Sequence, residues 1–322
     1  MTNYITMKVL ANDGISNSGI EALEAAGFEV LTTTVAQEQL ENYINKHNIT
    51  VLIVRSATTV RKNLIDNCPS LKIIGRGGVG MDNIDVDYAR SKGLHVINTP
   101  AASSHSVAEL VFGHFYGLAR FLHNSNRDMP LEGDANFKAL KKSYAKGTEL
   151  KGKTLGVLGF GRIGQATAKV AIGAGMKVVA FDPFLEKANL QLDFFDGQKV
   201  DFEIKTISKE EVLKQSDFVT LHVPAQDSYV IGEKEFSQMK DGVIIANAAR
   251  GGVVDEVALL NAIKSGKVSR AALDVFEKEP QPEIQLLMNP ALSLTPHTGA
   301  ATNEAQDRIG LELAEQIISI LG

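Results

Sequence analysis

Short apolar runs alternate with amphipathic stretches along the first third of the chain. The run Val51–Val54 has no polar interruption, as expected of a strand that is covered on both faces. Between the first two runs, Ser18 is expected to cap a helix that reaches Ala26 and ends at Gly27. Strands are predicted at Lys8–Leu10, Phe28–Leu31, Val51–Val54, Leu71–Ile74 and His95–Ile97. Strands separated by helices in this way predict a parallel α/β unit.

A second alternation of the same kind follows a long predicted helix at Ser104–Phe121, in which apolar residues recur at helical spacing. The stretch from Asn124 to Lys151 is polar and indicates loops and short helices. Strands are predicted at Thr154–Leu158, Lys177–Phe181, Phe218–His222, Gly242–Ala246, Arg270–Leu273 and Leu292–Leu294. Helices are predicted at Ile163–Gly173, Lys209–Gln215, Glu233–Met239, Glu256–Ser265 and Glu304–Leu321. The expected fold class is α/β, with two doubly wound parallel-sheet units.

Length and charge agree with two ordinary globular domains. The 322 residues, at roughly 150 per domain, predict two of them. The net charge of −5 argues against a nucleic-acid-binding protein, which needs a cationic face. Cys68 is the single cysteine, which excludes an intrachain disulfide and a cysteine-rich zinc site. Residues 1–13 contain no long apolar run, so we expect no secretory signal or membrane anchor and predict a cytoplasmic protein.

One glycine motif predicts a dinucleotide site. Residues 159–164 read GFGRIG, follow an apolar strand and open a helix. In such a turn Gly159 permits the tight bend, Gly161 lets a pyrophosphate approach and Gly164 allows close packing of helix on strand. Asp182 ends the next strand, 23 residues after Gly159, where a carboxylate accepts hydrogen bonds from a ribose diol. Its charge would repel a 2′-phosphate, so NAD is favoured over NADP as the cofactor.

A second glycine motif, GRGGVG at residues 75–80, also follows a strand. It lacks the acid at the end of the next strand, and the sequence directly after Gly80 is acidic, which disfavours a pyrophosphate. Exposed N–H groups in such a loop can still hold a smaller anion such as a carboxylate. A tight turn without a ligand is the alternative.

Three residues of the carboxy-terminal part suit the oxidation of a hydroxy acid. Arg250, His297 and Glu279 each follow a predicted strand, where open α/β sheets place ligands. Arginine can clamp a carboxylate with two hydrogen bonds, and histidine titrates near neutral pH. A carboxylate beside an imidazole favours the protonated ring and fixes its orientation. Taken singly, each of the three is as well explained by a surface or structural role. The other histidines show no metal-binding spacing, so no metal is expected.

Four strings resemble one family. LGFGRIG at 158–164, NAARGGVVDE at 247–256, ALDVF at 272–276 and TPH at 295–297 occur in this order in the D-isomer-specific 2-hydroxyacid dehydrogenases, and the similarity covers nearly the whole chain. The strings VRSAT at 54–58, GRGGVGMDN at 75–83 and GTELKGK at 147–153 are most similar to the D-3-phosphoglycerate dehydrogenases of that family.

The resemblance implies a role for each matching residue. His297 is implied as the general acid/base, paired with Glu279, and Arg250 as the group that binds the substrate carboxylate and carbonyl. For the substrate, the resemblance implies that the backbone N–H groups of Val79 and Gly80 hold its carboxylate. It also implies that Arg55 and Arg76 approach its phosphate. The family also implies a basic residue of a neighbouring subunit near the phosphate, for which Lys141 or Lys142 is a looser match. The implied NAD-binding residues are Gly159, Gly161, Arg162, Ile163, Gly164, Asp182, His222, Pro224, Ala248 and Asp274, with Asp274 facing the nicotinamide carboxamide.

The resemblance also implies the domain organisation. A flavodoxin-like substrate domain would comprise residues 1–99 and 297–322, with a Rossmann NAD-binding domain at 100–296 inserted into it and the substrate in the cleft between them. Residues 101–150 would form much of a homodimer interface. Because the last predicted helix reaches the end of the sequence, we expect no carboxy-terminal regulatory domain.

The implied reaction is the NAD-dependent oxidation of D-3-phosphoglycerate to 3-phosphohydroxypyruvate by direct hydride transfer, in serine biosynthesis. Two alternatives stay open. A glyoxylate or hydroxypyruvate reductase, or another D-2-hydroxyacid dehydrogenase, would share every catalytic residue. A dinucleotide-sensing binding protein of the corepressor kind uses the same fold without turnover, so fold alone does not decide.

Overall fold

The computed structural model describes residues 6–322, and the chain divides into two compact units. One comprises the described residues up to Ser104 together with Ala300–Gly322, and the other comprises His105–Gly299. Residues 100–104 therefore lie with the first unit and 297–299 with the second, a few positions from the predicted limits. Of the amino-terminal segment in which no signal is expected, residues 1–5 lie outside the described part of the chain.

The first unit is a five-stranded parallel sheet in the order β2-β1-β3-β4-β5. Its strands are β1 (Lys8–Ala11), β2 (Glu29–Leu31), β3 (Ile49–Val54), β4 (Ile73–Arg76) and β5 (His95–Asn98). Its helices are α1 (Asn17–Ala25), α2 (Leu40–His47), α3 (Lys62–Asn67), α4 (Val86–Ser91) and α13 (Asn303–Leu321), with the 3-10 turn η1 (Gln37–Gln39) before α2. This is the flavodoxin-like order.

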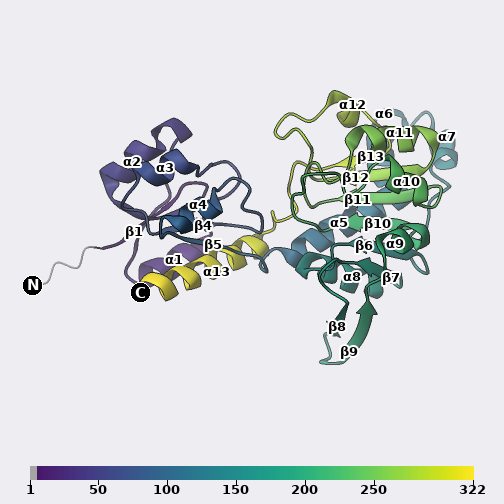
Figure 1. Cartoon of the computed structure of the whole chain (residues 1–322). Coiled ribbons are helices and arrows are strands. Elements are labelled where there is room, and N and C mark those ends of the chain that lie inside the picture. The colour runs from purple at the N-terminus through teal and green to yellow at the C-terminus, as the bar shows by residue number, and fades with distance from the viewer. Residues whose placement is uncertain (1–5) are drawn as a thin grey trace, which may run out of the picture. The chain divides into compact units, whose positions relative to one another are not determined.

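Both faces of this sheet are covered, as the unbroken apolar run in β3 predicts (Figure 1). Val51 and Ile53 pack in one apolar cluster with residues of α1 and α13, and Leu52 and Val54 in another with residues of α2, α3 and α4. Helix α13 joins this unit by close packing on α1, since a Cβ on Gly19 would lie 2.9 Å from the Gly310 backbone. The expected cap of α1 was wrong by two residues: Ser16, not Ser18, accepts the N–H of Gly19.

The second unit contains a six-stranded parallel sheet in the order β13-β12-β11-β10-β6-β7. The strands are β6 (Thr154–Leu158), β7 (Lys177–Phe181), β10 (Phe218–Leu221), β11 (Val243–Asn247), β12 (Val268–Leu273) and β13 (Leu292–Leu294). The helices are α5 (Ser104–Arg120), α6 (Leu122–Glu132), α7 (Phe137–Ser143), α8 (Arg162–Gly173), α9 (Lys209–Gln215), α10 (Glu233–Gln238), α11 (Glu256–Ser265) and α12 (Ile284–Leu287). One apolar cluster joins the sheet to α5 and α8, and another joins it to α9, α10 and α11. The two doubly wound units predicted from the sequence are confirmed.

A β-hairpin after β7 was not predicted. Strands β8 (Lys187–Asp193) and β9 (Lys199–Lys205) pair in antiparallel register and project from the second unit beside α8 (Figure 1). Leu190 is fully buried and anchors the hairpin in the cluster that contains α8, while the alternate residues face outward. Among residues 6–322, no helix is long and apolar enough to cross a membrane.

Candidate active site

The turn between β6 and α8 needs its glycines for separate reasons. Gly159 has φ +90°, and a Cβ there would lie 2.5 Å from the carbonyl oxygen of His222. A Cβ on Gly164 would lie 2.2 Å from the carbonyl oxygen of Gly159. A Cβ on Gly161, by contrast, would meet nothing within 4 Å. The first and third glycines thus permit the tight turn and the close helix packing, and the second leaves an open face that suits a pyrophosphate.

Charged and polar groups surround this open face. Helix α8 begins without a side-chain cap, so the N–H groups at its start, including those of Arg162 and Ile163, are available to an anion. Asp182 follows β7, and its Oδ2 accepts the N–H of Phe160 at 2.7 Å while Oδ1 accepts that of Phe184 at 2.9 Å. These bonds hold the carboxylate beside the glycine turn. The residues present therefore fit a bound dinucleotide.

His222, Pro224 and Ala248 follow the neighbouring strands β10 and β11, so they lie at the same carboxyl edge of the sheet. The Nε2 atom of His222 lies 3.1 Å from Thr167 Oγ1 and 3.2 Å from Thr220 Oγ1. Burial lowers the pKa of His222 to about 3, so its ring is neutral. Its Nδ1 is buried and has no hydrogen-bond partner among the described residues.

Arg250 stands on a turn that a buried asparagine shapes. Asn247, 4% exposed at the end of β11, donates from Nδ2 to the Arg250 carbonyl at 2.9 Å and accepts the N–H of Ala249 at 3.1 Å. The Arg250 guanidinium donates to the Ala249 carbonyl at 2.6 Å. A Cβ on Gly251 would lie 1.8 Å from the Phe276 carbonyl oxygen, so only glycine allows this turn to pack on the segment that carries Glu279.

The structure brings Glu279 and His297 together. His297 Nδ1 lies 2.9 Å from Glu279 Oε2, and the other carboxylate oxygen, Oε1, accepts the N–H of Phe276 at 3.0 Å. Both side chains are partly exposed, at 43% for His297 and 36% for Glu279. The pair therefore combines an oriented imidazole with side chains that are still partly open to solvent.

The loop before Glu279 is fastened to helix α11 by two reciprocal hydrogen bonds. Glu277 donates its N–H to Glu256 Oε1 at 2.8 Å, and Glu256 donates its N–H to Glu277 Oε1 at 3.2 Å. Burial and the nearby charge of Glu277 raise the pKa of Glu256. Neither residue is predictable as part of the site from the sequence, because neither lies in a recognisable spacing with Glu279.

Asp274 holds the loop that carries His297. It is 1% exposed, and its two carboxylate oxygens accept from the Thr295 hydroxyl at 2.6 Å, the Thr298 N–H at 2.8 Å and the Gly299 N–H at 2.9 Å. Between these contacts His297 adopts φ +55°, a left-handed conformation that non-glycine residues rarely take. Both carboxylate oxygens of Asp274 thus accept hydrogen bonds from the loop. The contact of Asp274 with the nicotinamide carboxamide stays a prediction.

In the first unit, Arg55 follows β3 and Arg76 ends β4, the strand next to it, with Val54 opposite Arg76 in the register. Asp13 accepts the Arg55 N–H at 2.6 Å, and Asn83 donates to the Arg55 carbonyl at 2.7 Å. Burial lowers the pKa of the Arg55 guanidinium, and the charge of Asp13 opposes this effect. Arginine titrates so high that the group stays cationic.

The second glycine loop lies between these arginines and offers free donors. The Arg55 side chain comes within 3.6 Å of the position a Cβ would take on Gly77, and the Arg76 guanidinium lies over Gly78. Among the described residues, nothing accepts the backbone N–H of Val79 or Gly80. The loop therefore combines two cations with two unused amides, which suits a small anion. Lys141 and Lys142 lie exposed on α7, in the second unit.

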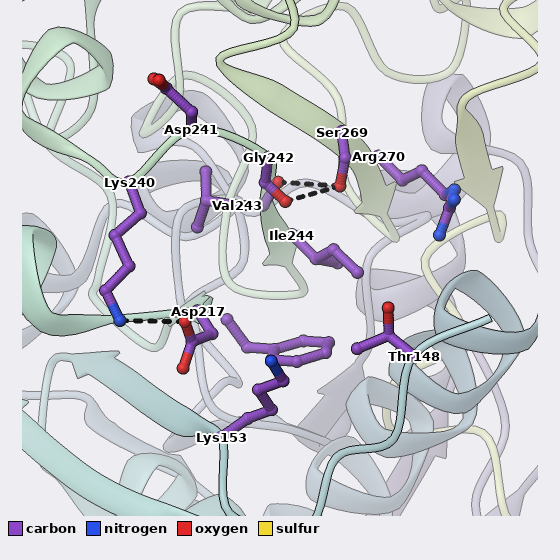
Figure 2. A pocket seen from close by; sticks show the side chains of 11 residues that line it. Thr148, Lys153, Asp217, Lys240, Asp241, Gly242, Val243, Ile244, Ser269 and Arg270 are labelled. Carbon is purple, nitrogen blue, oxygen red and sulfur yellow. Dashed lines mark hydrogen bonds and ion pairs between the residues drawn. The ribbon is translucent and has the colours of Figure 1, made fainter. Parts of the chain in front are cut away.

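A cavity of about 270 Å³ lies elsewhere in the second unit (Figure 2). Its lining includes residues at the starts of β6, β10, β11 and β12, so it opens at the amino edge of the sheet. Lys240 bonds Asp217 across it at 2.9 Å. None of the predicted site residues lines this cavity, and ligands of parallel sheets bind at the opposite, carboxyl edge. Within residues 6–322, no cluster of metal-ligating side chains is present.

The comparisons with known proteins identify the class. A family model described as the NAD binding domain of D-isomer specific 2-hydroxyacid dehydrogenases matches residues 112–299. The hydroxypyruvate reductase of Thermotoga maritima is 42% identical over 321 residues, which cover 98% of both chains. The D-3-phosphoglycerate dehydrogenase of Methanocaldococcus jannaschii is 41% identical over 317 residues, which cover 98% of this chain and 57% of that one. The chain belongs to the D-isomer-specific 2-hydroxyacid dehydrogenase family.

Solved structures agree with this assignment. A glyoxylate reductase from Paecilomyes thermophila is 31% identical with a TM-score of 0.78, over 98% of this chain and 95% of that one. A D-lactate dehydrogenase from Aquifex aeolicus, complexed with NAD and lactic acid, is 29% identical with a TM-score of 0.74, over the same shares. The protein is thus an NAD-dependent oxidoreductase that acts on a small 2-hydroxy or 2-oxo acid, as predicted from the sequence.

The position of Asp182 leads to a prediction about cofactor choice. The D182S variant is expected to raise kcat/KM with NADP relative to NAD by about tenfold or more, because the charge that repels a 2′-phosphate is removed. The KM for NAD should also rise, since the bond to the Phe160 N–H is lost. D193S, on the exposed hairpin, is the matched control and should leave the ratio unchanged. An unchanged ratio in D182S would contradict the assigned role.

Proposed function

We propose that this enzyme oxidises D-3-phosphoglycerate to 3-phosphohydroxypyruvate with NAD. The observation that carries the proposal is the pair of arginines around the 77–80 loop. Arg55 and Arg76 stand at the carboxyl ends of adjacent strands, beside the loop whose Val79 and Gly80 amides have no acceptor among the described residues. A doubly charged phosphate and a carboxylate are the two anionic groups of this substrate, and guanidinium groups and free amides are the donors that suit them.

The proposed chemistry assigns one task to each catalytic residue. His297 accepts the hydroxyl proton at Nε2, because Nδ1 is engaged by Glu279 at 2.9 Å. Glu279 orients the ring and stabilises the imidazolium that forms. Arg250 binds the substrate carboxylate and stabilises the developing carbonyl. NAD, which the glycine turn at residues 159–164 and Asp182 would hold, would supply the acceptor for the hydride from C2 of the substrate.

A second candidate is a hydroxypyruvate or glyoxylate reductase. It is favoured by the 42% identity to the Thermotoga maritima enzyme over 98% of both chains, whereas the chain spans 57% of the length of the phosphoglycerate dehydrogenase from Methanocaldococcus jannaschii. Both candidates need Arg250, Glu279 and His297. They differ in whether the far end of the substrate carries a phosphate, so Arg55 separates them.

The variant R55A tests the phosphate role. We expect kcat/KM for D-3-phosphoglycerate to fall by about 10- to 100-fold, equivalent to the roughly 1.5–3 kcal/mol of a hydrogen bond to a charged group. The value for D-glycerate should stay within about threefold, since no phosphate contact is lost. R61A is the matched control, because Arg61 is an exposed arginine of the same unit that pairs with Asp85. Equal losses of R55A on both acids would contradict the phosphate role.

The remaining expectations from the sequence stay predictions. They are a homodimer built largely on residues 101–150, a contribution of Lys141 or Lys142 from the neighbouring subunit, a cytoplasmic location and a place in serine biosynthesis. We also propose the predicted division of labour, in which the first unit binds the substrate and the second binds NAD.

A further inference from the structure

A buried histidine on α5 contacts the strand that leads to the catalytic loop. His114 is 6% exposed. Its Nδ1 lies 2.8 Å from the Ser293 hydroxyl oxygen, and its Nε2 lies 3.1 Å from the Thr295 hydroxyl oxygen. Ser293 is in β13 and Thr295 directly follows it, so His114 contacts the chain two residues before His297. No sequence pattern predicts a part for His114 in the site.

The hydrogen bonds around His114 have one consistent direction. The Thr295 hydroxyl donates its single proton to Asp274 Oδ1 at 2.6 Å, an oxygen that also accepts the Thr298 N–H at 2.8 Å. Toward His114 the same oxygen must therefore accept, which places the imidazole proton on Nε2. Nδ1 then accepts from the Ser293 hydroxyl. Burial lowers the pKa of His114, and this effect exceeds the opposing charge of Asp274, so the ring is neutral.

This arrangement forms a continuous chain from α5 to His297. His114 donates to Thr295, Thr295 donates to Asp274, and the other contacts of Asp274 fix residues on the far side of His297. The His297 N–H itself donates to the Asp274 carbonyl at 2.8 Å. A left-handed residue persists only where its surroundings over-determine it. These bonds form part of the surroundings that hold His297 in its left-handed conformation.

We propose that neutral His114 is a positioning residue for the reaction: as an Nε2–H donor to Thr295, it holds Asp274 and the left-handed His297 in the geometry that proton transfer needs. The inference rests on the proposed role of His297 as the acid/base. It assigns to α5 a function in catalysis beyond its packing in the core.

Variants of His114 test the donor directly, in the full-length protein with whichever 2-hydroxy or 2-oxo acid it turns over. H114L removes the donor and is expected to lower kcat about tenfold while KM for NAD stays within about twofold. H114Q carries an amide N–H that can replace the imidazole donor, and should restore kcat to within about threefold of the unaltered protein. F115L is the matched control, because Phe115 is a fully buried neighbour on α5 outside this chain of bonds and its loss should leave kcat unchanged.

Two results would overturn the inference: H114L with unaltered kcat, or H114Q as impaired as H114L when thermal melts show both folded. The nitrogen spectrum of the imidazoles gives an independent readout, and a proton on Nδ1 of His114 instead of Nε2 would also contradict it. H297A separates this inference from the proposed function. If H297A turns over normally, the acid/base role fails, whereas normal turnover of H114L beside an inactive H297A overturns the positioning role alone.

Discussion

Replacement of His297 by alanine is expected to lower kcat by about 10²- to 10⁴-fold, the range that general acid/base catalysis contributes. The hydroxyl proton then has no acceptor, because Glu279 is held by the Phe276 N–H and would lose the imidazole through which it acts. Binding of NADH should be unchanged within about threefold, since the glycine turn and Asp182 are untouched. Steady-state turnover and a fluorescence titration with NADH measure the two quantities.

His95 offers the control for this experiment. It is an exposed histidine on β5, and H95A should keep both turnover and NADH binding. Normal turnover in H297A would contradict the catalytic assignment. A dinucleotide-sensing binding protein gives a different pattern, in which NADH binds but the unaltered protein turns over none of the acids offered.

Removal of the Arg250 guanidinium is expected to have the second largest effect. R250A should lower kcat/KM by about 10²- to 10³-fold, because two hydrogen bonds to a charged group, together worth roughly 3–4 kcal/mol, are lost from the transition state. R250K keeps the charge but loses the planar fork, and should fall between R250A and the unaltered enzyme. The Asn247 bonds to the backbone of this turn are preserved in both variants.

Initial rates over a range of substrate concentrations, with NAD saturating, measure this effect. A kcat/KM that is lowest in R250A, intermediate in R250K and highest in the unaltered enzyme supports a bidentate clamp. A loss of less than about threefold in R250A would show that Arg250 does not bind the reacting group.

Much of the fold follows from patterns that are local in the sequence. Buried parallel strands such as Val51–Val54 are recognisable because both faces must be apolar. The glycine turn is recognisable because Gly159 and Gly164 meet backbone atoms that no side chain could displace. The hairpin was missed, although Ala188, Leu190 and Leu192 alternate with polar residues in the period of two that is typical of a half-buried strand.

The internal support of the site could not be predicted in the same way. Asp274 and Thr295 lie 21 residues apart, and His114 and Thr295 lie 181 apart, so their hydrogen bonds depend on which strands become neighbours. Sequence spacing alone left His297 and Glu279 open to a surface role, and it was the family resemblance that paired them. The structure adds the 2.9 Å contact, while their catalytic roles stay predictions.

The proposed substrate is tested most directly by the rate of NADH formation with D-3-phosphoglycerate, measured beside D-glycerate at equal concentrations and with a trap for the oxo acid product. The proposal predicts a clearly higher kcat/KM for the phosphorylated acid, and a loss of that preference in R55A. A rate with D-3-phosphoglycerate no higher than with D-glycerate would contradict it and would favour a reductase of unphosphorylated oxo acids.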